Sequence, residues 1–221
     1  MKVLVLGASR GIGLEFVRQY REEGAAVTAT ARDNEGLARL KALGATAFKL
    51  DVVDPVSAAG LAWHVEGLAF DVVILNAGVM GPRHGGLEPP TQADFDLVMH
   101  TNVLGPMWLL PQLKDVLAPE GRLAVLSSRM GSIGLRTAPN AWLYRASKAA
   151  LNSVLKDASL ALQGQAVCVA FHPGWVRTDM GGAGADLPVT DSVSGMRATL
   201  QRVGPADNGG FFNFDGSPLS W

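Results

Sequence analysis

Short apolar runs alternate with longer amphipathic stretches along the whole chain of 221 residues. Short runs that are rich in valine, leucine and alanine are typical of buried strands. They predict strands over residues 2–6, 26–31, 46–50, 71–75, 122–126, 166–171 and 210–214. In 71–75 (DVVIL) the apolar residues are continuous, as in a parallel strand that is covered on both faces.

The stretches between these strands have the periodicity of amphipathic helices. They predict helices over residues 14–23, 35–43, 55–66, 93–117, 142–163 and 190–202. In 142–163 the stripe that faces the sheet consists of Leu151, Val154, Leu155, Ala158 and Leu162. We expect two helices in 93–117, because Pro106 and Pro111 lack the N–H donor and kink the region or tighten its start.

Strands and helices alternate without an internal repeat, a low-complexity linker or a domain boundary. Repeated βα units predict an α/β fold with a doubly wound parallel sheet. A chain of this length suits one such domain with a sizeable core. We therefore expect a single domain over residues 1–221.

Composition and charge exclude several classes of partner. The net charge is −1 and the charges are interspersed, so nothing points to nucleic acid or to an acidic membrane. No apolar run approaches the roughly 20 residues that span a bilayer. The single cysteine, Cys168, lies in an apolar run and cannot form an internal disulfide, so we expect a core residue and a cytoplasmic protein. His64, His84, His100 and His172 lack metal-ligand spacing, and no metal is expected.

A glycine-rich turn follows the first predicted strand. Gly7, Gly11 and Gly13 lie between the run 2–6 and the helix 14–23. A helix that starts directly after a strand presents unpaired N–H groups and the positive end of its dipole, which suits a pyrophosphate. The spacing Gly-x-x-x-Gly-x-Gly differs from the Gly-x-Gly-x-x-Gly fingerprint and is weak evidence alone. Its place between a strand and a helix predicts a cofactor site.

Tyr144 and Lys148 stand four residues apart at the start of a predicted helix, so both side chains share one face. A phenol is a poor proton donor at neutral pH, because its unperturbed pKa is about 10. A neighbouring ammonium favours the phenolate and lowers that pKa. The pair could therefore move a proton at an alcohol or carbonyl oxygen. Taken alone, the pair could also be a chance feature of a helix surface.

A set of short motifs runs along the whole chain in a fixed order. They are GASRGIG at 7–13, Asp51-Val52, Asn76-Ala77-Gly78, Asn102, Ser128, Tyr144-x-x-x-Lys148, and Pro173-Gly174 followed by Thr178. In these motifs and their order the sequence resembles the short-chain dehydrogenases/reductases over essentially its whole length. One departure is Leu6, where many members have threonine. The stretch 172–182 (HPGWVRTDMGG) and the ending 214–221 (FDGSPLSW) resemble the sniffer-type carbonyl reductases and C-factor-like proteins.

The resemblance implies a Rossmann-type fold with a Ser-Tyr-Lys-Asn catalytic site. Tyr144 would be the acid/base at the carbonyl oxygen, Lys148 would lower its pKa and hold the nicotinamide ribose, and Ser128 would hold the substrate oxygen. The backbone of Asn102 would help to hold a water molecule in a proton relay. From the residues alone, Ser127 and Ser128 could simply end a strand, and Asn102 could cap a helix.

The resemblance also implies the cofactor-binding positions. These are Gly7, Ser9, Arg10, Gly11, Ile12, Gly13, Arg32, Asp51, Val52, Asn76, Ala77, Gly78, Tyr144, Lys148, Pro173, Gly174, Val176 and Thr178. Within this set, Asp51 would meet the adenine edge with Val52 beneath it, and 76–78 would pass beside the adenosine ribose.

Charge at the end of the second strand indicates which cofactor is used. An acid there binds the ribose hydroxyls of NAD and repels the additional phosphate of NADP. Here the strand ends at Ala31 and Arg32 follows, with Arg10 in the glycine turn. Guanidinium groups suit a 2′-phosphate. Asp33 is the competing acid, but by family register it falls two positions late. NADP(H) is therefore favoured, and NAD(H) stays possible.

We therefore expect an NADP(H)-dependent oxidoreductase that reduces a carbonyl to an alcohol, or the reverse, by hydride transfer. Two alternatives stay open: a non-catalytic dinucleotide-sensing or signalling protein of the C-factor-like kind, and a sugar-nucleotide epimerase or dehydratase. No charged cluster is visible in the sequence, so an uncharged carbonyl substrate is favoured. Residues 181–188 (GGAGADLP) could form a substrate lid or a plain surface loop. The resemblance implies a homo-oligomer that pairs through the helices 93–117 and 142–163, although some relatives of the carbonyl-reductase kind are monomeric.

Overall fold

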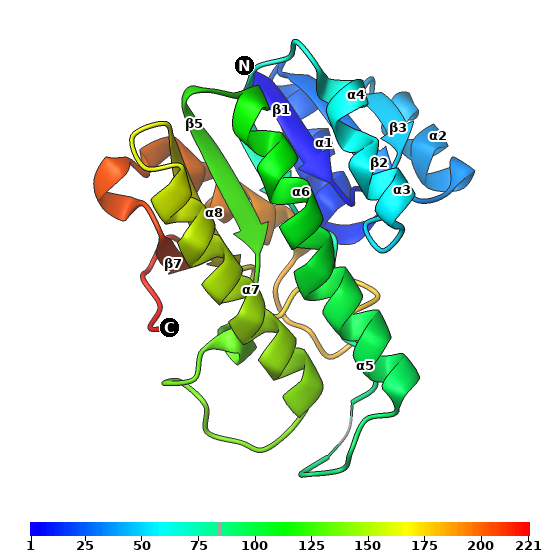
Figure 1. The fold of residues 1–221 in the computed structure, drawn as a ribbon, viewed down its shortest axis with the longest axis vertical. Coiled ribbons are helices and arrows are strands. Elements are labelled where there is room, and N and C mark those ends of the chain that lie inside the picture. Colours follow the sequence, from blue (N-terminus) through cyan, green and yellow to red (C-terminus); the bar gives the residue numbers. More distant parts are fainter. Residues whose placement is uncertain (84) are drawn as a thin grey trace.

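Seven strands form one parallel sheet at the centre of the protein (Figure 1). The computed structural model describes residues 1–83 and 85–221, so His84 lies outside the described residues. The strands are β1 Lys2–Leu6, β2 Ala26–Ala31, β3 Thr46–Lys49, β4 Phe70–Leu75, β5 Leu117–Leu126, β6 Ala166–His172 and β7 Gly210–Asn213. Their order is β3-β2-β1-β4-β5-β6-β7, and every neighbouring pair is parallel. The expected doubly wound parallel sheet is confirmed.

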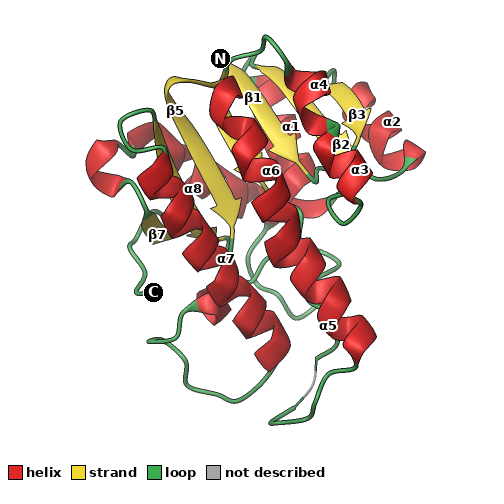
Figure 2. Ribbon diagram, viewed as in Figure 1, coloured by secondary structure: helices red, strands yellow, loops and turns green. Residues whose placement is uncertain are grey.

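Helices cover both faces of the sheet (Figure 2). On one face lie α1 Gly11–Glu22, α2 Asn34–Ala42 and α8 Val189–Arg202. On the other lie α3 Pro55–Ala59, α4 Leu61–Val65, α6 Gly105–Leu113 and α7 Trp142–Ala161. Within β1, Leu4 and Leu6 belong to one core and Val3 and Val5 to the other, all fully buried. Burial on both faces explains why the strands are continuous apolar runs.

The strand order places a switch point beside β1, which lies between β2 and β4. In open α/β sheets, ligands bind outside the carboxyl ends of the strands at such a point. Helix α5 Gln92–Met99 and the first half of α7 extend past that edge of the sheet (Figure 1). The fold therefore brings the glycine turn, the ends of β4 and β5, and the start of α7 to the same edge.

One expected helical region is divided at a glycine, and the two helices expected in 93–117 are confirmed. The helix expected over 55–66 is two short helices, α3 and α4, which meet at Gly60. The region expected over 93–117 begins with α5, passes through a π-helical turn at His100–Leu104 and continues as α6. Pro106 lies in the first turn of α6, and Pro111 lies inside it.

Strand β5 begins at Leu117, whereas its start was expected at residue 122. Pro119 and Gly121 indicate a turn in the sequence, but the chain forms a bulged strand there. Glu120 has a φ of 59°, and the pairing with β4 shifts register. A bulge of this kind keeps the strand in the sheet while leaving extra residues unpaired.

No helix in the described ranges is long and apolar enough to cross a membrane. The same ranges contain no group of metal-ligating side chains. Cys168 is a buried core residue, as expected, and burial raises the pKa of its thiol to about 12. The homo-oligomer stays a prediction.

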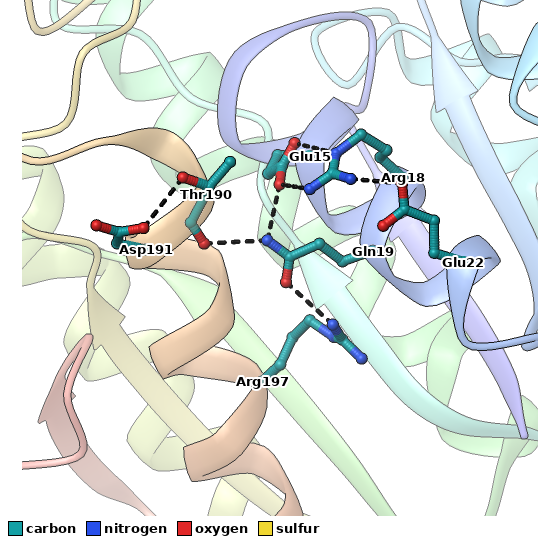
Figure 3. Close-up of polar contacts among 7 residues, drawn as sticks. All are labelled: Glu15, Arg18, Gln19, Glu22, Thr190, Asp191 and Arg197. Atoms are coloured by element: carbon teal, nitrogen blue, oxygen red, sulfur yellow. Dashed lines mark hydrogen bonds and ion pairs between the residues drawn. The ribbon is translucent and has the colours of Figure 1, made fainter.

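A polar network joins α1 to α8 on one face of the sheet (Figure 3). Glu15 accepts hydrogen bonds from Arg18 and from Nε2 of Gln19. Burial acts to raise the pKa of Glu15, but these hydrogen bonds outweigh it and hold the pKa below its usual value. Gln19 also donates to the carbonyl oxygen of Thr190 in the first turn of α8. The start of α8 is thereby fixed to the helix that follows the glycine turn.

Arg197 is the buried centre of the same contact and is 7 % exposed. Its Nη1 donates to Oε1 of Gln19, and its Nη2 forms an ion pair with Glu23. The guanidinium carbon lies 4.4 Å from the centroid of the Tyr20 ring. Helix α1 is thus fixed in position by a group on α8, which follows the loop after β6.

Arg197→Ala should lower the free energy of unfolding by about 1–3 kcal/mol, because Gln19 would keep a buried oxygen without a donor. For a chain of this size, each kcal/mol lowers the melting temperature by roughly 2–4 °C. The measurements are urea unfolding and calorimetry. The control is Arg202→Ala, an exposed arginine on the same helix, which should change stability by less than about 0.5 kcal/mol. Equal effects of the two substitutions would contradict the assigned role.

Candidate active site

Two cavities open at the carboxyl ends of the strands and meet at Tyr144. The first, of about 430 Å³, lies beside the glycine turn and the ends of β1, β2 and β4. The second, of about 870 Å³, lies beyond β5 and β6 and the loops that follow β4 and β6. Tyr144 lines both cavities, as do Ile12, Ser127, Pro173, Thr178 and Met180. Any two molecules that fill the cavities together would therefore meet beside Tyr144.

The glycine turn packs tightly against the end of β4. Gly7 has a φ of 85°, a left-handed conformation that favours glycine, and its N–H donates to Oγ1 of Thr30. A Cβ atom on Gly13 would lie 2.5 Å from the Gly7 carbonyl oxygen. Nδ2 of Asn76 donates to that same oxygen at 2.5 Å. Because the turn is closed in this way, α1 can begin at Gly11 at the wall of the first cavity.

Most of the expected cofactor positions line the first cavity. They are Gly7, Ser9, Arg10, Gly11, Ile12, Arg32, Asp51, Val52, Asn76, Ala77, Gly78, Tyr144, Lys148, Pro173 and Thr178. Gly13 lies behind the turn, and Gly174 and Val176 line the second cavity instead. A cavity that begins at Arg32, passes the N-terminus of α1 and ends at Lys148 fits a dinucleotide with its phosphates at that N-terminus.

Four charged side chains near the first cavity differ in whether they face the cavity or bind another part of the protein. Arg32 lines the first cavity, whereas Asp33 caps α2 and accepts a hydrogen bond from the Gly36 N–H at 2.6 Å. Arg10 forms an ion pair with Asp179 at 2.9 Å, across from the glycine turn to the loop after β6. Both of these side chains are exposed, so the pair contributes little stability.

Two adjacent serines follow β5, and their hydroxyl groups have different partners. Ser127 donates to Oδ1 of Asn152 at 2.5 Å, within the buried layer under α7. Ser128 accepts from the Met130 N–H, and a hydrogen bond between its side chain and Tyr144 acts to lower the tyrosine pKa. The geometry therefore favours Ser128 over Ser127 as the partner of Tyr144.

Tyr144 and Lys148 share one face of α7, but burial dominates the proton affinity of each. Nζ of Lys148 lies 5.8 Å from the centroid of the Tyr144 ring and donates to the carbonyl oxygen of Leu126 at 2.7 Å. Burial raises the pKa of Tyr144 to about 12, against the opposing hydrogen bond with Ser128. Burial also lowers the pKa of Lys148 to about 8. The net shift of the Tyr144 pKa is therefore upward, whereas the Tyr-Lys spacing predicted a lowered pKa, because the loss of phenolate solvation is the largest effect.

Asn102 lies in the π-helical turn and is fully buried. Its Oδ1 accepts from the Val79 N–H, and its Nδ2 donates to the Val79 carbonyl oxygen, each at 2.8 Å. Nδ2 also donates to Ser147, whose hydroxyl donates to the carbonyl oxygen of Tyr144. The side chain therefore ties the loop after β4 to α7 instead of capping a helix. Such π-helical turns often occur at functional sites.

The segment 181–188 is bonded to the loop after β6. Nε1 of Trp175 donates to the Gly181 carbonyl oxygen, and Nε of Arg177 donates to that of Ala185, both at 2.9 Å. Val176 and Leu187 form a parallel bridge. These bonds give the segment a defined position at the second cavity, and a substrate lid and a plain surface loop both stay open as interpretations of it.

Several residues at the site were not identified by the motifs. Arg83, Arg129 and Arg145 all line the second cavity. Arg129 and Arg145 directly follow Ser128 and Tyr144 in the sequence, which is the signal that could have revealed them. The substrate was instead expected to be uncharged because the three arginines are far apart along the chain.

Gly131 is another residue at the site that the motifs did not identify, and its role is steric. A Cβ atom at this position would lie 2.8–2.9 Å from the backbone and Cβ of Lys148. Only glycine allows the turn after Ser128 to pack this closely on α7. The sequence shows Gly131 near the two serines, but nothing in it indicates that the contact is with Lys148.

Comparison with known proteins agrees with this geometry. Residues 1–186 match the family model for short chain dehydrogenases. The chain belongs to the short-chain dehydrogenase family. It is an oxidoreductase of that family, and the family expected from the motifs is confirmed.

Relatives also fall in the expected branch. The C-signal protein of Myxococcus xanthus is 40 % identical over 156 residues, which cover 68 % of this chain and 92 % of the relative. The NADPH-bound carbonyl reductase from chicken fatty liver is 33 % identical, with a TM-score of 0.88 over 100 % of this chain and 98 % of that one. The carbonyl reductase Sniffer of D. melanogaster is 29 % identical, with a TM-score of 0.90 over 100 % and 99 % of the two chains.

Lys148→Met should raise the free energy of unfolding at pH 7 by about 1–4 kcal/mol, because an apolar side chain replaces a buried charge. In the folded wild type the pKa of about 8 lies below the ordinary value of 10.5. The unfolded state then binds more protons between these values, so wild-type stability rises with pH there and the advantage of the variant shrinks.

The measurement is urea unfolding of both proteins at intervals between about pH 7 and pH 10. Lys156→Met, at an exposed position of the same helix, is the control and should show no such trend. An advantage of Lys148→Met that stays constant over this range would contradict the assigned pKa of Lys148.

Proposed function

We propose that the protein is an NADP(H)-dependent carbonyl reductase that interconverts a carbonyl compound and its alcohol. The observation that carries the proposal is the position of Tyr144, whose side chain lines both the dinucleotide-shaped cavity and the second cavity. A proton donor at that junction can act on a substrate oxygen while the cofactor lies next to it. The NADPH-bound carbonyl reductase from chicken fatty liver shares the fold over the whole chain and supports the choice of cofactor.

The residues of the first cavity would hold the cofactor in three parts. The N-terminus of α1 would hold the pyrophosphate, Arg32 the 2′-phosphate, and Lys148 the nicotinamide ribose. Asp51 would accept from the adenine edge, with Val52 beneath the ring. When bound, NADPH supplies the hydride in the reduction, and NADP⁺ accepts it in the reverse direction.

Tyr144 and Ser128 would act on the substrate oxygen. With a pKa of about 12, Tyr144 keeps its proton at neutral pH and can donate it to a carbonyl oxygen that gains negative charge. Ser128, which hydrogen-bonds with Tyr144, would hold the same oxygen. The Lys148 ammonium would stabilise the phenolate that remains. Asn102 would act indirectly, because its side chain fixes Val79 and Ser147 beside these groups.

Tyr144→Phe should lower turnover by about 100-fold or more while NADPH binding stays within about threefold, because the ring remains and the proton donor is lost. Turnover is followed as NADPH consumption with a panel of carbonyl compounds, and binding by fluorescence. The control is Tyr20→Phe, the only other tyrosine of the chain, which is buried between α1 and α8. It should keep turnover near the wild-type value. Near wild-type turnover of Tyr144→Phe would refute the assignment.

Arg32→Ala should weaken NADPH binding about tenfold and leave NADH binding nearly unchanged, because an exposed charge-assisted contact with the 2′-phosphate would be lost. Ala31→Asp combined with Arg32→Ala should favour NADH, because a carboxylate accepts from ribose hydroxyls and repels phosphate. The dissociation constants of both cofactors are measured at low and moderate salt, since screening should weaken the preference.

Lys41→Ala, at an exposed position of α2, is the matched control. If the wild type binds NADH as well as NADPH, the phosphate contact is wrong. Asp33 would not replace it as the ribose contact in this arrangement, because it caps α2 and does not line the cavity.

A second candidate function is signalling without catalysis, and the identity with C-signal favours keeping it. The two functions differ in what they need from Tyr144. A dinucleotide sensor requires the first cavity but no proton donor, so the turnover assay with Tyr144→Phe separates the two. The epimerase alternative is disfavoured, because the match over residues 1–186 is to the short chain dehydrogenases.

A further inference from the structure

The second cavity has an unbalanced positive charge. Arg83, Arg129 and Arg145 come from three separate segments, the loop after β4, the turn after β5 and the start of α7, and all three line it. Among the described residues, no aspartate or glutamate lines this cavity or forms an ion pair with any of the three arginines. A cavity with cations and no counter-charge is suited to an anion.

Arg145 is the best-positioned of these cations, because it is both buried and oriented. It is 9 % exposed, and it follows Tyr144 directly on α7. Its Nε donates to the Asn140 carbonyl oxygen at 2.8 Å, and its Nη2 donates to Oδ1 of Asn140 at 2.6 Å. In the described part of the chain Nη1 has no hydrogen-bond partner. A buried guanidinium that is held by neutral oxygens leaves its charge uncompensated.

Two further polar side chains line the second cavity together with Arg145. Arg129 is exposed at the cavity, and its side chain makes no hydrogen bond within the described residues, so its whole guanidinium group is available. His172 also lines the cavity, and its buried Nδ1 has no hydrogen-bond partner. Burial and the neighbouring Arg129 lower the pKa of His172 to about 4, so the imidazole is neutral at pH 7. A neutral imidazole can bond to a polar ligand without repelling a cation.

The cofactor cannot account for these groups. Arg83, Arg129 and Arg145 do not line the first cavity, where Arg10, Arg32 and Arg177 lie. The phosphates of a dinucleotide in the first cavity would therefore lie beside a different set of arginines. The uncompensated charge belongs to the side of Tyr144 where the substrate binds.

We propose that the carbonyl substrate carries an anionic group, a carboxylate or a phosphate, which Arg145 and Arg129 bind while the carbonyl oxygen lies against Tyr144. This inference rests on the proposed function and names its substrate class. It replaces the uncharged substrate that the sequence favoured, because the fold gathers cations that are separated along the chain. Arg83, which donates to the Met180 carbonyl oxygen at 2.9 Å, adds positive charge to the same cavity.

The first experiment compares matched substrates with enzyme that is saturated with NADPH. The anionic substrates are para-formylbenzoate and para-formylphenyl phosphate, and the neutral one is the methyl ester of para-formylbenzoate. We expect kcat/KM to be about tenfold or more higher for an anion than for the ester. The comparison of carboxylate with phosphate shows which anion the cavity prefers. Equal or higher kcat/KM for the neutral ester would overturn the proposal and leave the proposed function standing.

Single substitutions test which arginines cause the preference for an anionic substrate. Arg145→Gln and Arg129→Gln should each lower kcat/KM for the preferred anion by about 10- to 100-fold and change that for the ester by about twofold at most. Arg136→Gln removes an equal charge nearby but from outside the cavity, and should keep the preference for the anion. If Arg145→Gln fails to fold, Arg129→Gln still decides, since that side chain is exposed. An unchanged anion-to-ester ratio in Arg129→Gln would overturn the assignment.

A binding measurement separates this proposal from the proposed function. Para-toluate and para-tolyl phosphate cannot be reduced, and their affinity for the NADP⁺ complex is measured by calorimetry beside that of methyl para-toluate. Tighter binding of an anion, lost in Arg129→Gln, would support the anion site even if no carbonyl compound were reduced. In that case the proposed carbonyl reductase activity would be refuted and the anion site would stand. Equal affinity for the anions and the ester would overturn the anion site, whatever the turnover.

Discussion

The buried ammonium group of Lys148 is the constraint on which the site depends. It is 4 % exposed and is bound by the Leu126 carbonyl oxygen at the end of β5. Three neighbours fit closely around it. Gly131 gives the side chain room at its base, a Cβ on Gly78 would come within 3.3 Å of Nζ, and Asn102 holds the loop that contains Gly78 and Val79. A charge buried at this cost requires that strand, turn and helix keep fixed positions.

The sheet, the order of its elements and the glycine turn could be predicted from sequence because each depends on local patterns. Continuous apolar runs indicate burial on both faces of a strand. A closed turn is indicated by three glycines between a strand and a helix, namely Gly7, Gly11 and Gly13. The errors fell where local signals conflict with tertiary pairing. Pro119 and Gly121 indicate a turn, yet β4 and β6 hold this segment in a bulged strand. Gly60 divides a helix that periodicity alone would continue.

The site was only partly predictable for the same reason. Spacing placed Tyr144 and Lys148 on one helix face, and most motif positions line the first cavity. The proton affinities did not follow from spacing, because the depth of burial is set by β5 and by the turn after it. Nor could adjacency distinguish Ser127 from Ser128, whose hydroxyl groups point to different partners. The arginines of the second cavity come from loops that only the folded chain brings together.

The parallel sheet also divides the two binding tasks between separate parts of the chain. The residues that line the adenosine end of the first cavity, Arg32 and 50–53, lie on the β1–β3 side of the switch point. The cations of the second cavity lie between 83 and 145, after β4. The residues that line both cavities, and so must serve both tasks, are Ile12, Ser127, Tyr144, Pro173, Thr178 and Met180. The adenosine end and the three cations are outside this shared set. Cofactor preference and substrate range can therefore diverge independently among descendants of one ancestral gene, without a new fold.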